Sequence, residues 1–269
     1  MLRPLLKLGC LAVILYLCVA AGIFFAQRAL IFPAPKEKVA APRGFAEVSY
    51  RTRDGLVLSA AYRRAAPTMP TVVFFHGNGD NWNGAATATS RLAQAGYGVL
   101  LPEYRGYSGN PGNPSEAGLY HDGRAALTWL ETQGVDRSHI AIIGNSIGSG
   151  VAVQMALEHP PAALVLISPL ARLPDVAAEK FPWLPARWLV RDHFDNLAKI
   201  DRMRAPVLIL HGKADSLIPS DHARRLAGKS HRARLELFDG AGHELAYLDK
   251  VGEAGLRWLN GVFGLVGAD

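Results

Sequence analysis

The sequence contains only two cysteines among its 269 residues, Cys10 and Cys18, and both lie in an apolar N-terminal stretch. The rest of the chain therefore excludes a disulfide framework, a cysteine-ligated zinc site and a cysteine nucleophile. The chain also lacks a long basic run, although its formal net charge is +6. Without a basic or aromatic-basic motif, we do not expect nucleic acid as a partner. The positive balance fits an anionic membrane surface more simply.

Two motifs typical of other enzyme classes are also missing. His243-Glu244-Leu245-Ala246-Tyr247 lacks the second histidine of the metalloprotease pattern H-E-x-x-H. Gly77-Asn78-Gly79 lacks the Gly-Lys-Ser/Thr ending of a phosphate-binding loop. The sequence thus predicts neither a metal nor a cofactor.

An uncharged apolar stretch occupies residues 8–26, which is close to the length that spans a bilayer as a helix. We predict that residues 1–27 form an uncleaved membrane anchor. The alternative is a cleaved signal peptide, because Val19-Ala20-Ala21 resembles a cleavage site, and the protein would then be secreted. The apolar run continues past that site through Phe25, which favours the anchor.

Charges flanking this stretch discriminate poorly between the two membrane orientations. Arg3 and Lys7 precede it, while Arg28, Lys36 and Lys38 follow it. A short N-terminal tail commonly stays in the cytoplasm. We therefore expect a single-pass protein whose folded domain lies on the non-cytoplasmic side.

Residues 28–269 are expected to form one α/β domain, because short apolar strands alternate with helices. Such strands are typical of a parallel sheet that is covered on both faces. A hairpin around Asp54-Gly55 brings the count to about eight strands. The predicted strands are residues 47–50, 56–62, 71–75, 97–101, 140–143, 164–167, 207–210 and 235–238, and the predicted helices are residues 83–95, 115–133, 147–158 and 244–260.

The alternation lapses at about residues 170–205, where aromatic residues occur among prolines. We interpret this segment as a small, irregular helical insertion over the sheet. It is either a lid on the site or a packed crossover that touches no substrate, and the sequence does not favour one over the other.

Gly144-Asn145-Ser146-Ile147-Gly148 fits the pattern G-x-S-x-G, in which a serine nucleophile stands on a sharp turn between a strand and a helix. The pattern alone is a modest signal, but here it follows an apolar strand and opens a predicted helix. Glycines two residues before and after the serine leave room where a Cβ atom would clash with neighbouring strands. We therefore predict that Ser146 is a nucleophile.

A serine hydroxyl needs a base to take its proton, and in this strand–turn–helix arrangement an acid and then a histidine follow the serine along the chain. His243 lies in a glycine-rich loop directly after the last predicted strand, and Asp215 follows the strand at residues 207–210. We predict His243 as the base and Asp215 as the acid that orients it. His211 is expected to be structural.

An oxyanion hole needs two backbone N–H groups near the nucleophile. One is predicted from Ile147, the residue after the serine. The other is predicted from Asn78, in the small-residue turn His76-Gly77-Asn78-Gly79 that follows an earlier strand.

These motifs together resemble those of membrane-anchored α/β-hydrolase-domain proteins, which are similar to serine aminopeptidase-like hydrolases and to eukaryotic protein depalmitoylases. The segments HGNGDN, EYRGYSGNPGNPSEAGLYHDG, GNSIGSG, HGKADSLIP and GAGHE occur in the order expected of that family. The resemblance extends over residues 28–262 and implies the eight-stranded α/β-hydrolase fold with Ser146, Asp215 and His243 as its triad. One departure is Glu103, where relatives often have Asp.

The resulting hypothesis is a serine hydrolase that cleaves an acyl ester or thioester of a small molecule or a lipidated substrate near a membrane. A peptidase of the aminopeptidase type is the alternative within the same chemistry. A non-catalytic binding protein with this fold is the alternative from another class. The biological substrate, its chain length and the oligomeric state stay open.

Overall fold

A computed structural model describes residues 2–265 of the chain. Residue 1 and residues 266–269, the outer ends of the predicted anchor and domain, lie outside the described residues. The helices are α1 (Leu2–Ile31), α2 (Trp82–Ala88), α3 (Ser90–Gln94), α4 (Glu116–Thr132), α5 (Gly148–Glu158), α6 (Leu173–Lys180), α7 (Ala186–Leu189), α8 (Asp221–Lys229) and α9 (Asp249–Phe263), with short 3₁₀ helices η1 (Arg137–His139), η2 (Ile200–Arg202) and η3 (His243–Tyr247).

Eight strands form one sheet, which confirms the predicted fold class. They are β1 (Ala46–Arg51), β2 (Val57–Arg63), β3 (Thr71–Phe75), β4 (Gly98–Pro102), β5 (Ile140–Asn145), β6 (Ala163–Ile167), β7 (Val207–Gly212) and β8 (Ala233–Phe238). Their order across the sheet is β1-β2-β4-β3-β5-β6-β7-β8. The β2 strand is antiparallel to its neighbours β1 and β4, and the other pairs are parallel.

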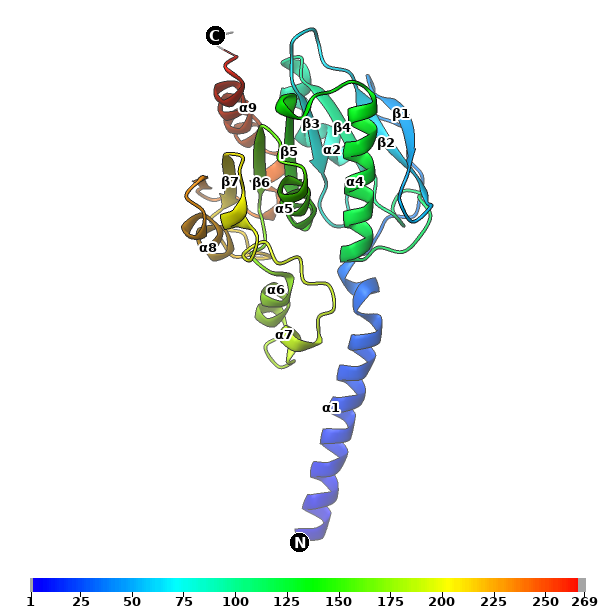
Figure 1. Ribbon diagram of the computed structural model, residues 1–269. Helices are drawn as coiled ribbons and strands as arrows, with labels where there is room; N and C mark the ends of the chain where they lie inside the picture. The colour runs from blue at the N-terminus through cyan, green and yellow to red at the C-terminus, as the bar shows by residue number, and fades with distance from the viewer. Residues whose placement is uncertain (1, 266–269) are drawn as a thin grey trace.

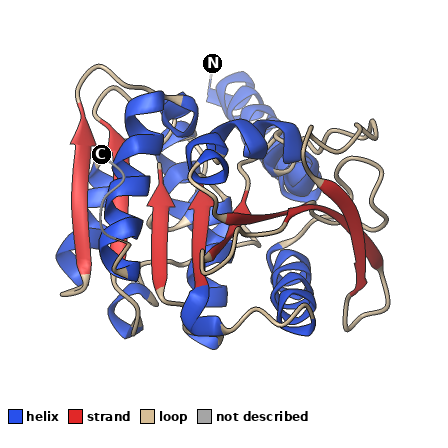
Figure 2. Ribbon diagram, turned by 90° about the horizontal axis from the view of Figure 1, so that it is seen from above, coloured by secondary structure: helices blue, strands red, loops and turns tan. Residues whose placement is uncertain are grey.

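Helices cover both faces of the sheet and create two hydrophobic cores (Figure 2). One core joins the sheet to α4, α5 and α8, and the other joins it to α2, α3 and α9. Strands β3 to β7 are buried along their length because they are covered on both sides. This explains why these strands are continuously apolar in sequence rather than alternating.

Two predicted helices are each divided into two elements. The helix expected at residues 83–95 is interrupted at Thr89, whose buried hydroxyl donates to the carbonyl of Ala85 at 2.8 Å. Such back-bonding competes with regular helical geometry. The helix expected at residues 244–260 is interrupted at Leu248, whose backbone is extended, so η3 and α9 are separate.

The N-terminal helix α1 continues four residues past residue 27, the expected end of the anchor, to Ile31. It projects from the domain on the side where α6 and α7 lie (Figure 1). The chain after it packs inward, since Phe32 is buried in the core and its ring contacts that of Phe194. In the described chain, α1 is the one helix long and apolar enough to cross a membrane, and a signal sequence would meet the same criteria.

Replacing Leu166 by alanine tests how much the buried sheet contributes to stability. Leu166 lies in β6, between β5 and β7, and is fully buried in the first core. Because the surrounding strands cannot collapse into the space, Leu166→Ala should lower the free energy of unfolding by about 2–5 kcal/mol. Chemical denaturation measures this value.

Val57→Ala is the matched control, because Val57 lies at the start of β2 and is 46% exposed. Val57→Ala should lower the free energy of unfolding by less than about 1 kcal/mol. Equal losses in the two variants would contradict the assignment of β6 to the core.

Candidate active site

Ser146 stands on the turn between β5 and α5 with a φ of 54°, in the left-handed region that residues other than glycine rarely adopt. The turn can form because Gly144 and Gly148 lack a Cβ atom, which would clash with the neighbouring chain. A Cβ atom on Gly148 would lie 2.2 Å from the carbonyl oxygen of Phe75, and one on Gly144 would lie 2.6 Å from the Cβ atom of Ala152. The strained serine is therefore set by packing on both sides of the turn.

His243 and Asp215 lie in line with this serine. The Nε2 atom of His243 lies 2.9 Å from Ser146 Oγ, and its Nδ1 atom lies 2.8 Å from Asp215 Oδ2. An ionised carboxylate can only accept, so Nδ1 carries the proton and Nε2 is free to accept one from the serine hydroxyl. The three side chains come from three different loops at the carboxyl ends of β5, β7 and β8.

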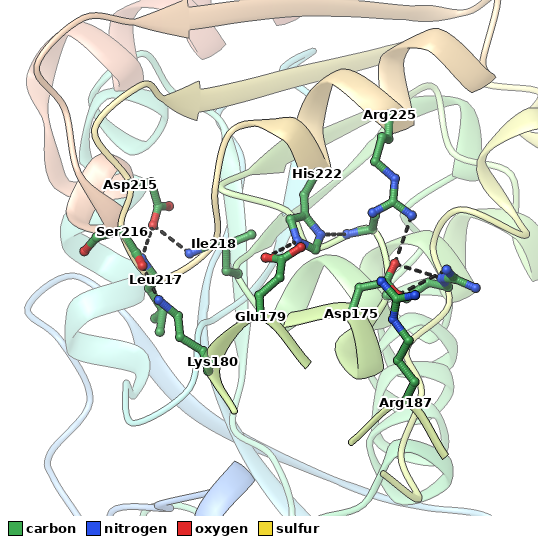
Figure 3. Close-up of polar contacts among 12 residues, drawn as sticks. Asp175, Glu179, Lys180, Arg187, Asp215, Ser216, Leu217, Ile218, His222 and Arg225 are labelled. Carbon is green, nitrogen blue, oxygen red and sulfur yellow. Dashed lines mark hydrogen bonds and ion pairs between the residues drawn. The ribbon is translucent and has the colours of Figure 1, made fainter. Parts of the chain in front are cut away.

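Asp215 is held by a dense set of donors. Its Oδ1 atom accepts from the backbone N–H groups of Leu217 and Ile218, each at 2.9 Å, as the dashed lines in Figure 3 show. Burial alone would raise the pKa of this carboxyl group, but contacts with His211 and His243 outweigh it and hold the pKa below its usual range. Asp215 is therefore ionised at neutral pH.

His211 is a supporting residue of this acid, consistent with the structural role expected of it. Its imidazole is fully buried, with Nε2 2.8 Å from the carbonyl oxygen of Ile218 and 3.5 Å from Asp215 Oδ2. It thereby fixes the loop that carries Asp215.

The two N–H groups predicted for the oxyanion hole belong to residues that line the same cavity as Ser146. Within residues 2–265, neither Ile147 N–H nor Asn78 N–H has a hydrogen-bond acceptor. The side chain of Asn78 is engaged elsewhere: Oδ1 accepts from the Tyr107 hydroxyl at 2.7 Å, and Nδ2 donates to the carbonyl of Ile31. These bonds fix the Asn78 turn and leave its backbone N–H group available.

Behind this turn lies a buried acid–imidazole pair. His76 Nε2 lies 3.8 Å from Glu103 Oε2, and both side chains are almost completely inaccessible. Glu103 Oε1 accepts from the backbone N–H group of Trp82, at the start of α2. Burial raises the pKa of Glu103. The glutamate thus braces the polypeptide behind the Asn78 turn.

A cavity of about 280 Å³ opens beside Ser146 and has an almost entirely apolar lining. Leu173, Val176 and Leu184 line it from the insertion, and Leu217 and Ile218 line it from the loop that carries Asp215. Lys180 is the one charged side chain among its described lining residues. Within residues 2–265, no group of three or more His, Cys, Asp or Glu side chains could hold a metal ion.

Part of the lining comes from α1, which the sequence did not indicate. Ile23, Phe24, Gln27, Leu30 and Ile31 border the cavity. A uniformly apolar stretch offers no contrast that would mark one face as a binding surface. The single signal was Gln27, a polar residue at the end of that stretch, and it is 6% exposed.

Comparisons with known proteins agree with this geometry. Residues 70–198 match the family model described as the alpha/beta hydrolase fold. Human alpha/beta hydrolase domain-containing protein 17B is 32% identical over 197 residues, which cover 72% of this chain and 67% of that protein. This chain belongs to the α/β-hydrolase family.

Two further similarities fit this α/β hydrolase. An uncharacterized protein of Mycobacterium tuberculosis (strain CDC 1551 / Oshkosh) is 40% identical over 230 residues, which cover 82% of each chain. The structure of a Pyrococcus furiosus esterase matches with a TM-score of 0.65 and 20% identity, over 86% of this chain and 96% of that one. At that identity, the match to the esterase supports the α/β-hydrolase fold alone.

Glu103→Gln tests the buried acid of this α/β hydrolase. An unfolded glutamate ionises near pH 4.3, whereas burial raises the pKa in the folded state. The folded state thus retains a proton that the unfolded state loses, and wild-type stability should fall as pH rises from about 4 through the raised pKa. Glutamine has no such titration. The free energy of unfolding of Glu103→Gln minus that of wild type should therefore be larger at pH 7 than at pH 4, as measured by chemical denaturation at both pH values.

The control is Glu253→Gln, because Glu253 is half exposed on α9. Its stability difference from wild type should not change over the same pH interval. A pH-independent difference for Glu103→Gln as well would refute the raised pKa.

Proposed function

We propose that this α/β hydrolase is a serine hydrolase that cleaves an acyl ester or thioester through an acyl-enzyme on Ser146. The observation that carries the proposal is the hydrogen-bonded series from Ser146 Oγ through His243 to Asp215, with separations of 2.9 and 2.8 Å. These separations are within the reach required for proton transfer from a nucleophile to its base.

In this mechanism, Ser146 Oγ attacks the acyl carbonyl carbon while His243 Nε2 takes the hydroxyl proton. The N–H groups of Ile147 and Asn78 stabilise the negative charge on the carbonyl oxygen. The carbon–oxygen or carbon–sulfur bond breaks, and His243 returns the proton to the departing alcohol or thiol. Water then attacks the acyl-enzyme by the reverse proton path and releases the acid and free Ser146. Asp215 stays ionised and stabilises the imidazolium.

The cavity supports an acyl substrate over a peptide. An aminopeptidase must hold the ammonium group of its substrate, for which a carboxylate is suited. Among the described residues that line the cavity, the one charged group is the cation of Lys180, which would repel an ammonium group. Apolar side chains make up most of the remaining lining and suit an acyl chain.

We propose further that α1 anchors the protein in a membrane and that the catalytic domain lies on the non-cytoplasmic side. The length and composition of α1 support the anchor. Such an anchor would keep the active site beside lipid-like substrates.

Covalent labelling with a fluorophosphonate probe tests the nucleophile. Wild-type protein should be labelled, and Ser146→Ala should lose labelling completely because no other serine is hydrogen-bonded to His243 within residues 2–265. Ser138→Ala is the control, since Ser138 lies in the exposed η1 segment and should leave labelling intact. Labelling of Ser146→Ala would refute the assignment.

A substrate panel separates the esterase from its alternatives. We expect p-nitrophenyl esters to be hydrolysed and aminoacyl p-nitroanilides to be cleaved at least about 100-fold more slowly, since none of the described residues that line the cavity carries a carboxylate for an ammonium group. Release of p-nitrophenol and of p-nitroaniline gives both rates. Faster cleavage of the anilides would favour the peptidase, and inactivity on both would favour a binding protein.

A further inference from the structure

One face of the last two turns of α1 forms a wall of the cavity beside Ser146. The lining residues Ile23, Phe24, Gln27, Leu30 and Ile31 recur at the spacing of a single helical face. On this face Gln27 is buried and Ile23, Phe24 and Ile31 are half-buried, while Leu30 stays 63% exposed at the cavity's edge. Phe25, on another side of the helix, is 80% exposed. The helix therefore presents a selected surface to the cavity.

This end of α1 is fixed to the insertion by polar contacts. Gln27 Nε2 donates to the carbonyl of Leu189 at 3.2 Å, and Gln27 Oε1 accepts from the N–H group of Arg191 at 2.8 Å. The neighbouring Arg28 pairs with the buried carboxylate of Asp192 at 3.0 Å. A buried amide with both of its ends satisfied specifies one position for the helix.

A second set of contacts ties the same end of α1 to the catalytic machinery. The Asn78 side chain donates to the carbonyl of Ile31, the last residue of α1, while its backbone belongs to the turn predicted to hold the oxyanion. Nearer the N-terminus of α1, the Tyr16 hydroxyl donates to the carbonyl of Trp183 at 3.1 Å. The insertion thus runs beside α1 for several turns.

The opposite wall, α6, is held against α8 and the Asp215 loop (Figure 3). Asp175 accepts from Arg225 at 2.9 Å, and Glu179 lies 3.2 Å from His222. Lys180 donates to the carbonyl of Ser216, next to Asp215. Figure 3 shows these three contacts side by side along α6. Both walls of the cavity are consequently positioned relative to the triad.

The size and chemistry of this partly open cavity suggest its ligand. A volume of about 280 Å³ holds roughly nine groups the size of a water molecule, and a methylene group is of similar size. Transfer of an alkyl chain from water to such a surface is favourable along its whole length. A chain lying there would have its carbonyl end at Ser146, because Ser146 and Ile147 border the same cavity.

We infer that this cavity binds the acyl chain of the substrate, a fatty acyl group of medium length, between the end of α1 and the insertion. The N-terminal helix is then part of the substrate site as well as a candidate anchor. That the bound chain belongs to a substrate rests on the proposed esterase or thioesterase function. Binding of the chain itself rests on the cavity alone.

A chain-length comparison tests the inference with the full chain held in amphipol. For p-nitrophenyl octanoate and acetate, kcat/KM is measured and the ratio of the two is taken. Ile23→Trp on α1 and Leu173→Trp on α6 both place a larger side chain into the cavity, and each should lower the ratio at least about tenfold. Leu15→Trp, on an exposed part of α1 away from the cavity, should leave it unchanged.

The outcomes separate the two walls. An unchanged ratio in both cavity variants would overturn the inference. A lower ratio in Leu173→Trp alone would overturn the role of α1 and leave chain binding to the insertion. Fluorophosphonate labelling of each variant reports the fraction of protein with an intact active site, so rates refer to folded enzyme.

Direct binding keeps the inference testable if neither ester is hydrolysed, which would count against the proposed function alone. Titration calorimetry of Ser146→Ala with decanoate should then give saturable binding that Ile23→Trp weakens at least about tenfold. Absence of decanoate binding, or equal binding to both proteins, would overturn the inference.

Discussion

The contact of Gly148 with the backbone carbonyls of Phe75 and His76 joins the two halves of the proposed active site. On one side of it, the chain turns through Ser146 with a strained φ. On the other, β3 ends and continues into the Asn78 turn. Since the contact leaves no room for a side chain, Ser146 and the second predicted oxyanion donor keep one relative position. The loops of Asp215 and His243 need only reach over to this fixed point.

Polar and apolar groups are sharply separated around that point. Hydrogen bonds from the backbone N–H groups of Leu217 and Ile218 concentrate on Asp215, and the nearby imidazole of His211 also favours the ionised carboxylate. The space on the other side of Ser146 is walled by hydrocarbon, except for Lys180 and a few neutral polar groups among its described residues. Chemistry at one end and apolar binding at the other fit a substrate with a reactive head and a long tail.

The strands and the grouping of Ser146, His243 and Asp215 could be predicted from the sequence because local patterns encode them. A buried parallel strand must be apolar throughout, and the Ser146 turn must be flanked by small residues. The interruptions at Thr89 and Leu248 were missed because they depend on a side-chain hydrogen bond and on tertiary packing, which periodicity does not record. The face of α1 that lines the cavity was missed because apolar residues surround the entire helix.

The position of the α1 contacts along the chain has a consequence for how the N-terminus could be processed. The first lining residue, Ile23, lies two residues beyond Val19-Ala20-Ala21, the sequence that resembles a cleavage site. A cut after Ala21 would separate the domain from most of the proposed membrane anchor and remove no residue of the cavity wall. Both forms of the chain would then share the residues that line the pocket, whereas the cleaved form would lose the contact of Tyr16 with Trp183.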